Sequence, residues 1–559
     1  MQEFLRFKKT NCKNCYKCIR HCPVKSIRFS AGQAHIIADE CILCGHCVVV
    51  CPQDAKQIVD ETEIVDVLLK EGSPVYASVA PSFAAYFEGT GFDALRQAIK
   101  KLGFADAEET AIGATMVKRE YEKQLRSGDY DVLISSCCPS VNLLIRKYYP
   151  KLIPYLSPVL SPMGAHSQDI KKRHPDAKTV FIGPCLSKKE EARECSVDAV
   201  LTFEELEEMF EENNIIPEQI MDSAEESRAR LFPTDGGILK TMDLEGLDDY
   251  TFLSISGTDN CIEAIHDIEN GQLHKCFIEM SSCPGSCIDG PIMAKYKNAP
   301  VRHYQSIVKY AGKKDFAVDE VSDGELDHVQ EYIGVHREMP LEADITATLR
   351  KMGKNTHADE LNCGTCGYNS CREKAIAVLQ GKADITMCLP YLMDKTERFS
   401  DTILNNTPNG IIVINEEFEI QQMNTAALKM LNIRNLSDIQ GEQLVRIFDP
   451  KPFLDVVYNG RSVRNEKDYY PEYQRYLEMT IVHDKMSHIL VGLIRDVTEA
   501  EEERQKKEQF GRKTIEVADQ VVDRQMRIVQ EIASLLGETA AETKIALTKL
   551  KETIDHEDE

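Results

Sequence analysis

The chain has 559 residues, 43% hydrophobic and 28% charged, and this length is enough for three or four domains. Asp and Glu outnumber Lys and Arg by 91 to 66, a formal net charge of -25, so attachment to nucleic acid or to an anionic membrane is not expected. Residues 1–12 lack a signal-peptide core, and no apolar run reaches the roughly 20 residues of a membrane span, which predicts a cytoplasmic protein. Twenty cysteines in a reducing compartment indicate metal ligands or reactive thiols rather than disulfides.

The first group of cysteines has a doubled spacing. The motif C-x2-C-x2-C-x3-C-P runs from Cys12 to Pro23 and again from Cys41 to Pro52. In bacterial ferredoxins, three such thiolates hold one iron-sulfur cube and the fourth, ahead of proline, reaches the other cube. The spacing predicts a two-cluster ferredoxin-like domain at residues 1–60, with zinc sites as the competing interpretation. One cluster would take Cys12, Cys15, Cys18 and Cys51, and the other Cys41, Cys44, Cys47 and Cys22.

Short apolar runs alternate with amphipathic stretches over residues 61–311, which predicts an α/β domain. Its expected buried strands are residues 74–79, 132–135, 179–182 and 253–255. Three loops carry cysteines beside Pro or Gly, at residues 136–139, 183–188 and 282–287. Loops beyond the carboxyl ends of parallel strands build the site in such sheets, so the three loops are expected to converge. Cys195, Cys261 and Cys276 lie outside them and are interpreted as buried small residues.

The three loops, the doubled motif and a further cysteine group resemble the FeFe (iron-only) hydrogenases over residues 1–395. The resemblance implies a 4Fe-4S cubane on Cys138, Cys185, Cys283 and Cys287, with Cys287 bridging to a diiron unit that carries CO, cyanide and an azadithiolate. It implies that Lys188 donates a hydrogen bond to one cyanide, and that Ala80, Pro81 and Ser82 line the other. A buried cyanide needs such a donor. From its surroundings alone, Lys188 could also be a solvated lysine.

The resemblance also implies a proton route and shows departures from the family. Cys137 would relay protons to the bridgehead amine, although a buried spacer is the plainer interpretation. The carboxylate relay is altered around residues 117–120, where Glu120 alone remains as an acid or as a solvated helix residue. Gly183 and Ser281 stand where many catalytic members have Met, and Met163 stands where they have Gln. These changes alter the surroundings of the diiron unit and argue against fast turnover.

A third cysteine group has the spacing C-x2-C-x4-C-x16-C. It comprises Cys363, Cys366, Cys371 and Cys388. It predicts a small 4Fe-4S domain at residues 358–395 after a charged linker at residues 312–357, and a zinc ribbon is the alternative.

The remaining chain carries no cysteine. Residues 396–499 resemble an α+β PAS domain, with a strand at 411–414, a helix opened by Asn424 and a closing Asp-Val-Thr-Glu. An empty PAS core is expected, and haem ligation by His483 or His488 is not favoured. Residues 500–559 predict a charged helix on which Ile515, Val522, Val529 and Leu536 recur every seven residues. That seam predicts a parallel homodimeric coiled coil, and the alternative is a helix folded back on the PAS domain.

These features together predict a sensory FeFe hydrogenase that binds H2 or slowly interconverts it with protons and electrons. Its cofactors would be the H-cluster and three additional 4Fe-4S clusters. Its partners would be a redox protein such as ferredoxin, maturation proteins and a separate signalling output protein. One alternative is a hydrogen-metabolising enzyme that uses ferredoxin. Another is a non-catalytic iron-sulfur scaffold, against which Cys137, Lys188 and Cys287 speak.

Overall fold

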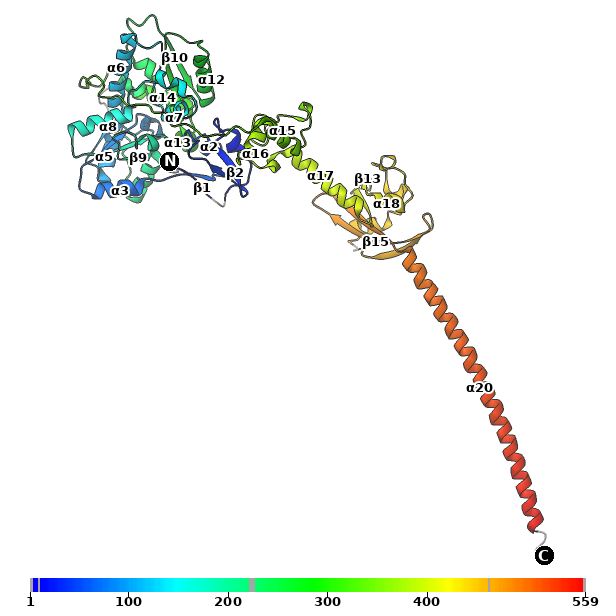
Figure 1. Ribbon diagram of the computed structural model, residues 1–559. Coiled ribbons are helices and arrows are strands. Elements are labelled where there is room, and N and C mark those ends of the chain that lie inside the picture. Colours follow the sequence, from blue (N-terminus) through cyan, green and yellow to red (C-terminus); the bar gives the residue numbers. More distant parts are fainter. Residues whose placement is uncertain (1–3, 9–10, 221–226, 461–462, 556–559) are drawn as a thin grey trace. The chain divides into compact units, whose positions relative to one another are not determined.

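The computed structural model describes residues 4–8, 11–220, 227–460 and 463–555 (Figure 1). The chain folds as two compact units, Met1–Leu392 and Met393–Glu559. Within the described ranges, every helix is too short or too polar to span a membrane.

The N-terminal module repeats one small motif, as the doubled cysteine spacing predicts. Strand β1 (Leu5–Phe7) pairs antiparallel with β4 (Lys56–Ile58), and β2 (Ile27–Ser30) pairs with β3 (Gln33–Ile36). One short helix contains the third cysteine of each motif, α1 (Lys17–Arg20) with Cys18 in the first half and α2 (His46–Val49) with Cys47 in the second.

Two parallel sheets form the frame of the α/β domain. The first has the order β6-β5-β8-β9 and the second the order β10-β11-β7. Their strands are β5 (Val75–Val79), β6 (Asp106–Glu109), β7 (Val132–Ile134), β8 (Lys178–Gly183), β9 (Ala199–Thr202), β10 (Thr251–Ser256) and β11 (Cys276–Ser281). The inner strands β5, β8 and β11 are almost wholly buried, as expected of parallel strands covered on both faces.

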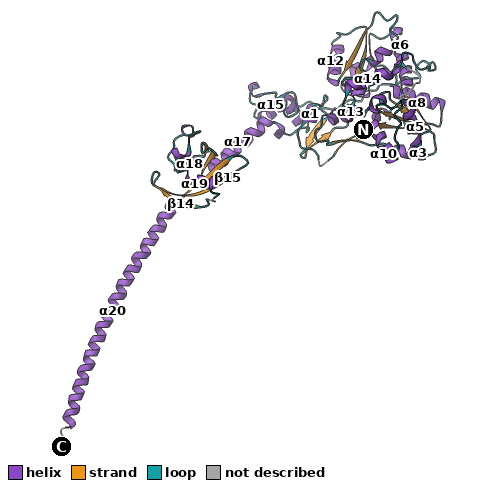
Figure 2. Cartoon of the chain, turned by 180° about the vertical axis from the view of Figure 1, so that it is seen from behind, coloured by secondary structure: helices purple, strands orange, loops and turns teal. Residues whose placement is uncertain are grey.

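Helices precede, connect and follow the parallel strands (Figure 2). They are α3 (Thr62–Lys70), α4 (Phe83–Tyr86), α5 (Phe92–Lys101), α6 (Ala111–Ser127), α7 (Pro139–Tyr148), α8 (Pro162–Arg173), α9 (Lys188–Glu191), α10 (Phe203–Glu212), α11 (Gly237–Thr241), α12 (Thr258–Glu269), α13 (Pro291–Tyr296) and α14 (Pro300–Tyr310). Helices α6 and α8 pack so closely that a Cβ on Gly113 would lie 2.3 Å from the carbonyl oxygen of Pro162.

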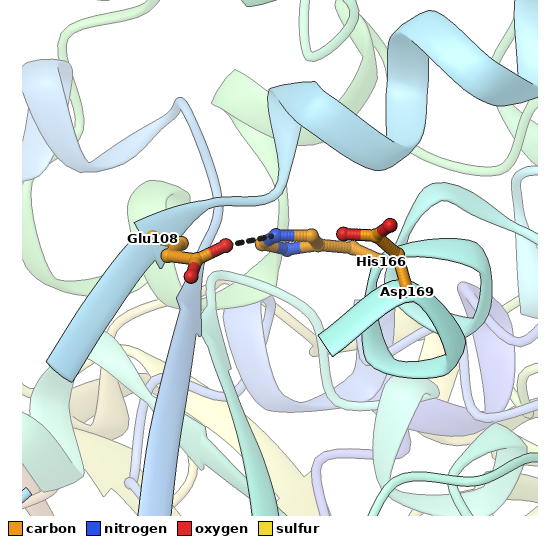
Figure 3. A group of neighbouring side chains, drawn as sticks. All are labelled: Glu108, His166 and Asp169. Carbon is orange, nitrogen blue, oxygen red and sulfur yellow. Dashed lines mark hydrogen bonds and ion pairs between the residues drawn. The ribbon is translucent and has the colours of Figure 1, made fainter. Parts of the chain in front are cut away.

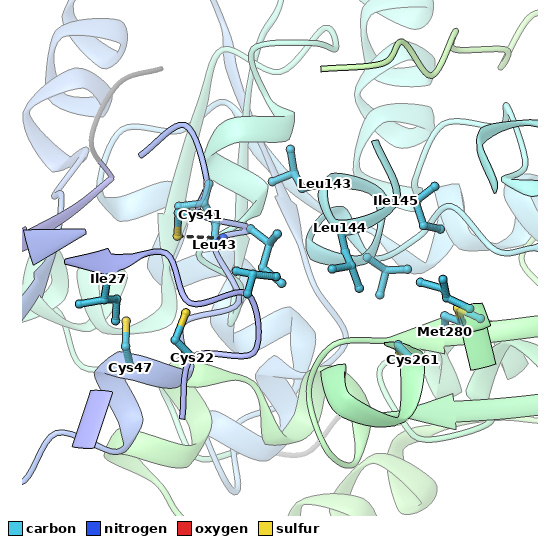
Figure 4. Close-up of a cluster of buried hydrophobic side chains, with 14 of the residues drawn as sticks. Cys22, Ile27, Cys41, Leu43, Cys47, Leu143, Leu144, Ile145, Cys261 and Met280 are labelled. Atoms are coloured by element: carbon cyan, nitrogen blue, oxygen red, sulfur yellow. Dashed lines mark hydrogen bonds between the residues drawn. The ribbon is translucent and has the colours of Figure 1, made fainter. Parts of the chain in front are cut away.

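One hydrophobic core joins the N-terminal module to the α/β domain (Figure 4). From the N-terminal module it contains Cys22, Ile27 and Cys47, and from the α/β domain it contains Leu144 and Met280. The two cysteine-rich regions are therefore parts of one packed body.

The third cysteine group lies in a small helical module. Helix α15 (Glu342–Lys351), inside the stretch that the sequence marks only as a linker, packs on α16 (Cys371–Leu379). Their contact buries Ile345, Ala375 and Cys388. Helix α17 (Leu389–Asn406) begins directly after Cys388.

The second unit contains a five-stranded antiparallel sheet with the order β13-β12-β16-β15-β14. Its elements are β12 (Gly410–Asn415), β13 (Ile420–Met423), α18 (Thr425–Met430), α19 (Lys451–Tyr458), β14 (Glu466–Tyr470), β15 (Arg475–Asp484) and β16 (Ile489–Asp496). The side chain of Asn424 caps α18 by accepting a hydrogen bond from the Ala427 N–H at 2.9 Å. His483 and His488 both pair with Glu416 at 3.2 Å.

Helix α20 (Thr498–Asp555) follows the sheet without interruption (Figure 1). The side chains of Ile515, Val522, Val529 and Leu536 are 57–65% exposed. The helix is therefore not folded back along the PAS domain, and its apolar seam faces solvent.

The core of the second unit depends on Phe453, which is fully buried. A Cβ on Gly492 would lie 2.7 Å from its ring, so α19 and β16 are in close contact. Phe453→Ala is expected to destabilise this unit by about 3–5 kcal/mol, because it leaves a cavity. Hydrogen exchange of β12, β15 and β16 in the full chain should accelerate, while that of the α/β domain should not. Val445→Ala, at a 68% exposed position, is the control. Unchanged exchange in the Phe453 variant would contradict this description of the core.

Candidate metal-cluster site

The carboxyl ends of β7, β8 and β11 direct three loops toward one place, as the sequence predicts. Their cysteines Cys138, Cys185, Cys283 and Cys287, called here the hydrogenase cysteines, line one cavity together with Cys44. Ala80, Pro81, Ser82, Phe181 and Met163 line a second cavity. Cys137, Cys185, Lys188 and Cys287 line both, so the two cavities adjoin.

Local structure fixes the direction of each loop. Cys138 is the N-cap of α7, whose first helical residue is Pro139. Lys188 is the first residue of α9, which follows Cys185 by one short turn. Gly285 has φ +78°, a left-handed conformation that lets the chain turn between Cys283 and Cys287.

The hydrogenase cysteines face the cavity, with Cys138, Cys185 and Cys283 half-buried and Cys287 exposed to it. Desolvation inside the site, reinforced by the charges of neighbouring groups, raises the pKa values of Cys138, Cys283 and Cys287. Metal binding would displace the protons of such thiols. The site therefore matches a ligand set that is completed by a metal cluster.

The spacing of the sulfur atoms bears on the choice between zinc and a larger cluster. A zinc ion with Zn–S bonds of about 2.3 Å holds its sulfurs about 3.8 Å apart. Across the described ranges, one group of three ligand atoms lies within 4.8 Å, and it contains no cysteine. No three cysteine sulfurs of the described residues therefore stand as close together as the ligands of a zinc tetrahedron.

That one close group is Glu108, His166 and Asp169 (Figure 3). Arg173 donates to both oxygens of Glu108, at 2.9 and 2.6 Å, and also contacts Asp169 at 2.9 Å. The two nitrogens of His166 face Glu108 and Ser78, at 3.2 and 2.8 Å. With its ligand atoms engaged in this way, the group stabilises the packing of α8 on the sheet and is not assigned to a metal.

A buried lysine accompanies each place where cysteines gather. Lys56 lies beside Cys18 and Cys47, Lys147 beside Cys41, Lys374 beside Cys366 and Cys388, and Lys188 beside Cys185 and Cys287. Each is 8% exposed or less. Lysines are rarely buried unless a negative charge compensates them. The donor sets therefore fit anionic clusters.

Some members of the three other predicted cysteine groups lie close together. The inner cluster group comprises Cys22, Cys41, Cys44 and Cys47, whose charges act on one another. The outer cluster group comprises Cys12, Cys15, Cys18 and Cys51, in which Cys12 and Cys51 act on Cys18. The third cluster group comprises Cys363, Cys366, Cys371 and Cys388, of which Cys371 and Cys388 pack in one small core.

Cys137 belongs to a buried hydrogen-bond network. The Tyr121 hydroxyl lies 3.3 Å from the Cys137 sulfur and 2.9 Å from the Ser136 hydroxyl oxygen. Burial raises the pKa of Cys137 to about 12, against the opposing effects of Tyr121 and Lys188. The ammonium of Lys188 donates to Ser161 at 2.8 Å, to Glu191 at 2.6 Å and to the carbonyl of Cys137 at 3.3 Å. Lys188 is therefore buried in the site rather than solvated.

The acid predicted from sequence is not brought to the site. Glu120 lines neither cavity, and its nearest ion-pair partner is Lys123 at 4.0 Å. Glu279, which sequence reasoning missed, lines the first cavity and is 3% exposed. Burial raises its pKa to about 7. The sequence did offer one indication of Glu279, because this acidic residue lies in the apolar strand β11, four residues before Cys283.

Two of the three unusual positions line the cavities, and the third lies behind the wall. Met163 lines the second cavity, and Ser281, at the end of β11, lines the first. A Cβ on Gly183 would lie 2.7 Å from the ring of Phe181, which lines the second cavity, so that ring occupies the space of a longer side chain at Gly183. The Ser281 hydroxyl accepts a hydrogen bond from Ser286 at 3.0 Å.

Family models match four parts of the chain. Residues 73–291 match the iron only hydrogenase large subunit, C-terminal domain, and residues 4–52 match a 4Fe-4S dicluster domain. Residues 359–390 match a putative Fe-S cluster family, and residues 398–465 match the PAS domain.

Curated relatives agree with these matches. The chain is 26% identical over 390 residues to the periplasmic Fe hydrogenase large subunit of Nitratidesulfovibrio vulgaris, covering 56% of this chain and 91% of that relative. It is 25% identical over 283 residues to iron hydrogenase 1 of Clostridium pasteurianum, covering 39% of this chain and 49% of that relative. A solved variant of an FeFe-hydrogenase from Chlamydomonas reinhardtii is 18% identical, with a TM-score of 0.40, covering 50% of this chain and all of that one. Residues 73–291 thus carry the C-terminal domain of the iron-only hydrogenase large subunit, and a PAS domain follows the iron-sulfur modules of the chain.

Proposed function

We propose that this protein is a sensory FeFe hydrogenase, which binds H2 or slowly interconverts it with protons and electrons. The observation that carries the proposal is the pair of adjoining cavities, one lined by the four hydrogenase cysteines and the other walled by Ala80, Pro81 and Ser82. That pair matches the two halves of an H-cluster, and it occurs in a chain that ends in a PAS domain and a long helix.

The hydrogenase cysteines would hold the cubane in the first cavity. Cys287, which lines both cavities, would bridge to the diiron unit in the second. The bound diiron unit would supply the metal centre at which hydrogen is cleaved or formed. The mostly apolar wall around Met163 and Phe181 would disfavour water beside the diiron unit.

Lys188 and Cys137 would have different roles at the diiron unit, the first as a hydrogen-bond donor and the second as a proton carrier. The ammonium of Lys188, now held by Ser161 and Glu191, can turn its donors toward a cyanide that needs a charged hydrogen bond in a dry cavity. The Cys137 thiol is protonated at neutral pH because burial raises its pKa to about 12, so it can hold and pass a proton. Tyr121 orients it at 3.3 Å.

The C-terminal unit supports the sensory part of the proposal. A PAS domain followed by an exposed apolar seam has no evident use in hydrogen metabolism alone. The seam would pair with the same helix of a second copy, because its apolar residues recur at the spacing of a parallel coiled coil. A separate output protein would read the state of the dimer.

Two other functions make different predictions. A hydrogen-metabolising enzyme that uses ferredoxin would turn over as fast as known producers. The departures at Met163 and Ser281, which line the cavities, and at Gly183, which lies behind Phe181, do not favour such turnover. A non-catalytic scaffold would need no second cavity and no buried Lys188 beside Cys287. Both alternatives retain iron-sulfur clusters, so the diiron unit and the turnover rate separate the three.

Infrared spectroscopy of the anaerobically matured protein tests the proposal. Carbonyl and cyanide bands are expected, and they should shift when H2 is added. Cys287→Ser should abolish the bands, because it removes the bridge between the two cavities. Cys276→Ala, at the opposite end of β11, is the matched control and should retain them. If a control hydrogenase matures but this protein shows no bands, the scaffold function replaces the proposal.

Removing the charge of Lys188 tests its role at the cyanide. Lys188→Met should keep the carbonyl bands but shift at least one cyanide band, since the hydrogen-bond donor is lost. Lys309→Met removes an exposed lysine on α14 and should leave the spectrum unchanged. Identical cyanide bands in the parent and the Lys188 variant would show that Lys188 does not contact the cluster.

Charges in the apolar seam test the dimer. Val522→Glu together with Val529→Glu should convert the dimer to a monomer in analytical ultracentrifugation, because like charges would meet in the coiled-coil core. Val521→Glu is the control, since Val521 is equally exposed but next to the seam. A parent protein that sediments as a monomer at micromolar concentration would contradict the dimer.

A further inference from the structure

The inner cluster group lies against the hydrogenase cysteines on one side. Cys44 lines the first cavity together with Cys283 and Cys287, and its charge acts on Cys283. The next residue, Gly45, has φ +71°, and a Cβ there would lie 2.3 Å from the Pro291 ring. Any residue other than glycine would clash here. The backbone of the inner cluster group therefore lies directly against Pro291 in the cavity wall.

A second side of the inner cluster group faces the third cluster group. The ammonium of Lys25 donates to three backbone carbonyls, those of Ile19 at 3.2 Å, Arg20 at 3.0 Å and Gly367 at 3.1 Å. Gly367 follows Cys366 directly, and a Cβ on it would lie 3.0 Å from the Ile19 side chain. The charges of Cys22 and Cys366 both act on Lys25, so the ammonium lies between the two groups.

Further contacts fix this arrangement. Arg20 donates to the carbonyl of Thr365 at 3.2 Å, and the Phe29 N–H donates to the carbonyl of Lys382 at 2.7 Å. The side chain of Lys382 pairs at 2.6 Å with Glu40, which is 7% exposed. Cys22, Cys366 and Tyr368 belong to the same hydrophobic core. The third module is therefore packed on the inner group.

The outer cluster group also neighbours the inner cluster group. Lys56 is close to Cys18 of the outer group and to Cys47 of the inner group. Cys15 is exposed, so the outer group has access to a soluble redox partner. The contacts that place the third module come from Arg20 at the end of α1, Lys25 in the following loop and Phe29 in β2, and the side chain of no outer cysteine makes them.

We propose that the inner cluster is a branch point, and that the third cluster receives electrons from it across the Lys25–Gly367 contact rather than by way of the outer cluster. This rests on the proposed function. The outer branch leads to a soluble redox protein, while the third branch ends at Cys388, where α17 begins. The third cluster is thus the electron acceptor whose redox state is passed on to the C-terminal unit.

The two branches can take up both electrons that one H2 releases. Oxidation of one H2 releases two protons and two electrons, whereas one 4Fe-4S cluster takes up one electron on reduction. The inner cluster accepts each electron in turn and is reoxidised when it reduces the outer or the third cluster by one electron. With both branches reduced, the two electrons of one H2 are stored outside the hydrogenase site.

Lys25 is the positioning residue of this contact. Its positive charge between Cys22 and Cys366 stabilises the reduced, more negative form of both neighbouring clusters. Lys25→Met should therefore lower the midpoint potentials of the inner and third clusters together and leave that of the outer cluster unchanged. Lys309→Met again serves as the control for loss of one positive charge. A shift confined to one cluster, or to the outer one, would overturn the assignment.

The order of reduction tests the branch itself. In the matured full chain, Cys12→Ser with Cys15→Ser removes the outer cluster, and freeze-quenched electron paramagnetic resonance follows the others after H2 is added. The third cluster should still be reduced, with a rate close to that of the parent. Loss of its reduction, or slowing by more than about tenfold while the inner cluster still reduces, would overturn the proposal.

Chemical reduction keeps this result separate from the proposed function. Dithionite reduces clusters without the hydrogenase site, and neighbouring reduced clusters broaden and split one another's signals. The branch predicts coupling between the inner and third clusters in the parent and in the Cys12/Cys15 variant. If H2 reduces no cluster in either protein but this coupling is present, the proposed function fails and the branch stands. Absence of the coupling overturns the branch.

Discussion

The fold depends on one electrostatic constraint, which is that several anionic sulfur clusters must be held away from water. Burial alone opposes thiolates, as the raised pKa values of Cys41, Cys44 and Cys283 show. Buried ammonium groups offset that cost, among them Lys147, whose nitrogen donates to the carbonyl of Cys41 at 2.6 Å. The modules pack into one body in part because these cations lie where elements from different modules meet.

The parallel sheets bring together residues that are far apart in the sequence. Each sheet delivers its loops at the carboxyl ends of its strands, β5 and β8 from one sheet and β7 and β11 from the other. Neither sheet alone supplies a complete set of ligands. The site lies where loops from the carboxyl ends of both sheets meet.

Cysteine spacing made most of the site predictable, because a ligand set leaves a local pattern of Cys, Pro and Gly. The PAS domain and the α/β class were likewise visible in strand order and loop composition. Glu279 and Lys25 were not, since a single charged residue in a strand or loop carries no sign of what it will face. Their roles depend on long-range contacts, such as the one from Lys25 to Gly367, which no local pattern encodes.

Two cysteines of different groups show how local surroundings control a thiol when no cluster is present. Burial raises the pKa of Cys283 in the hydrogenase site, whereas the hydrogen bond with Thr365 lowers the pKa of the exposed Cys363. The thiolate is the form that oxidants attack, so a lower pKa and greater exposure both make a cysteine more reactive. Without a cluster, Cys363 is therefore more open to oxidation than Cys283.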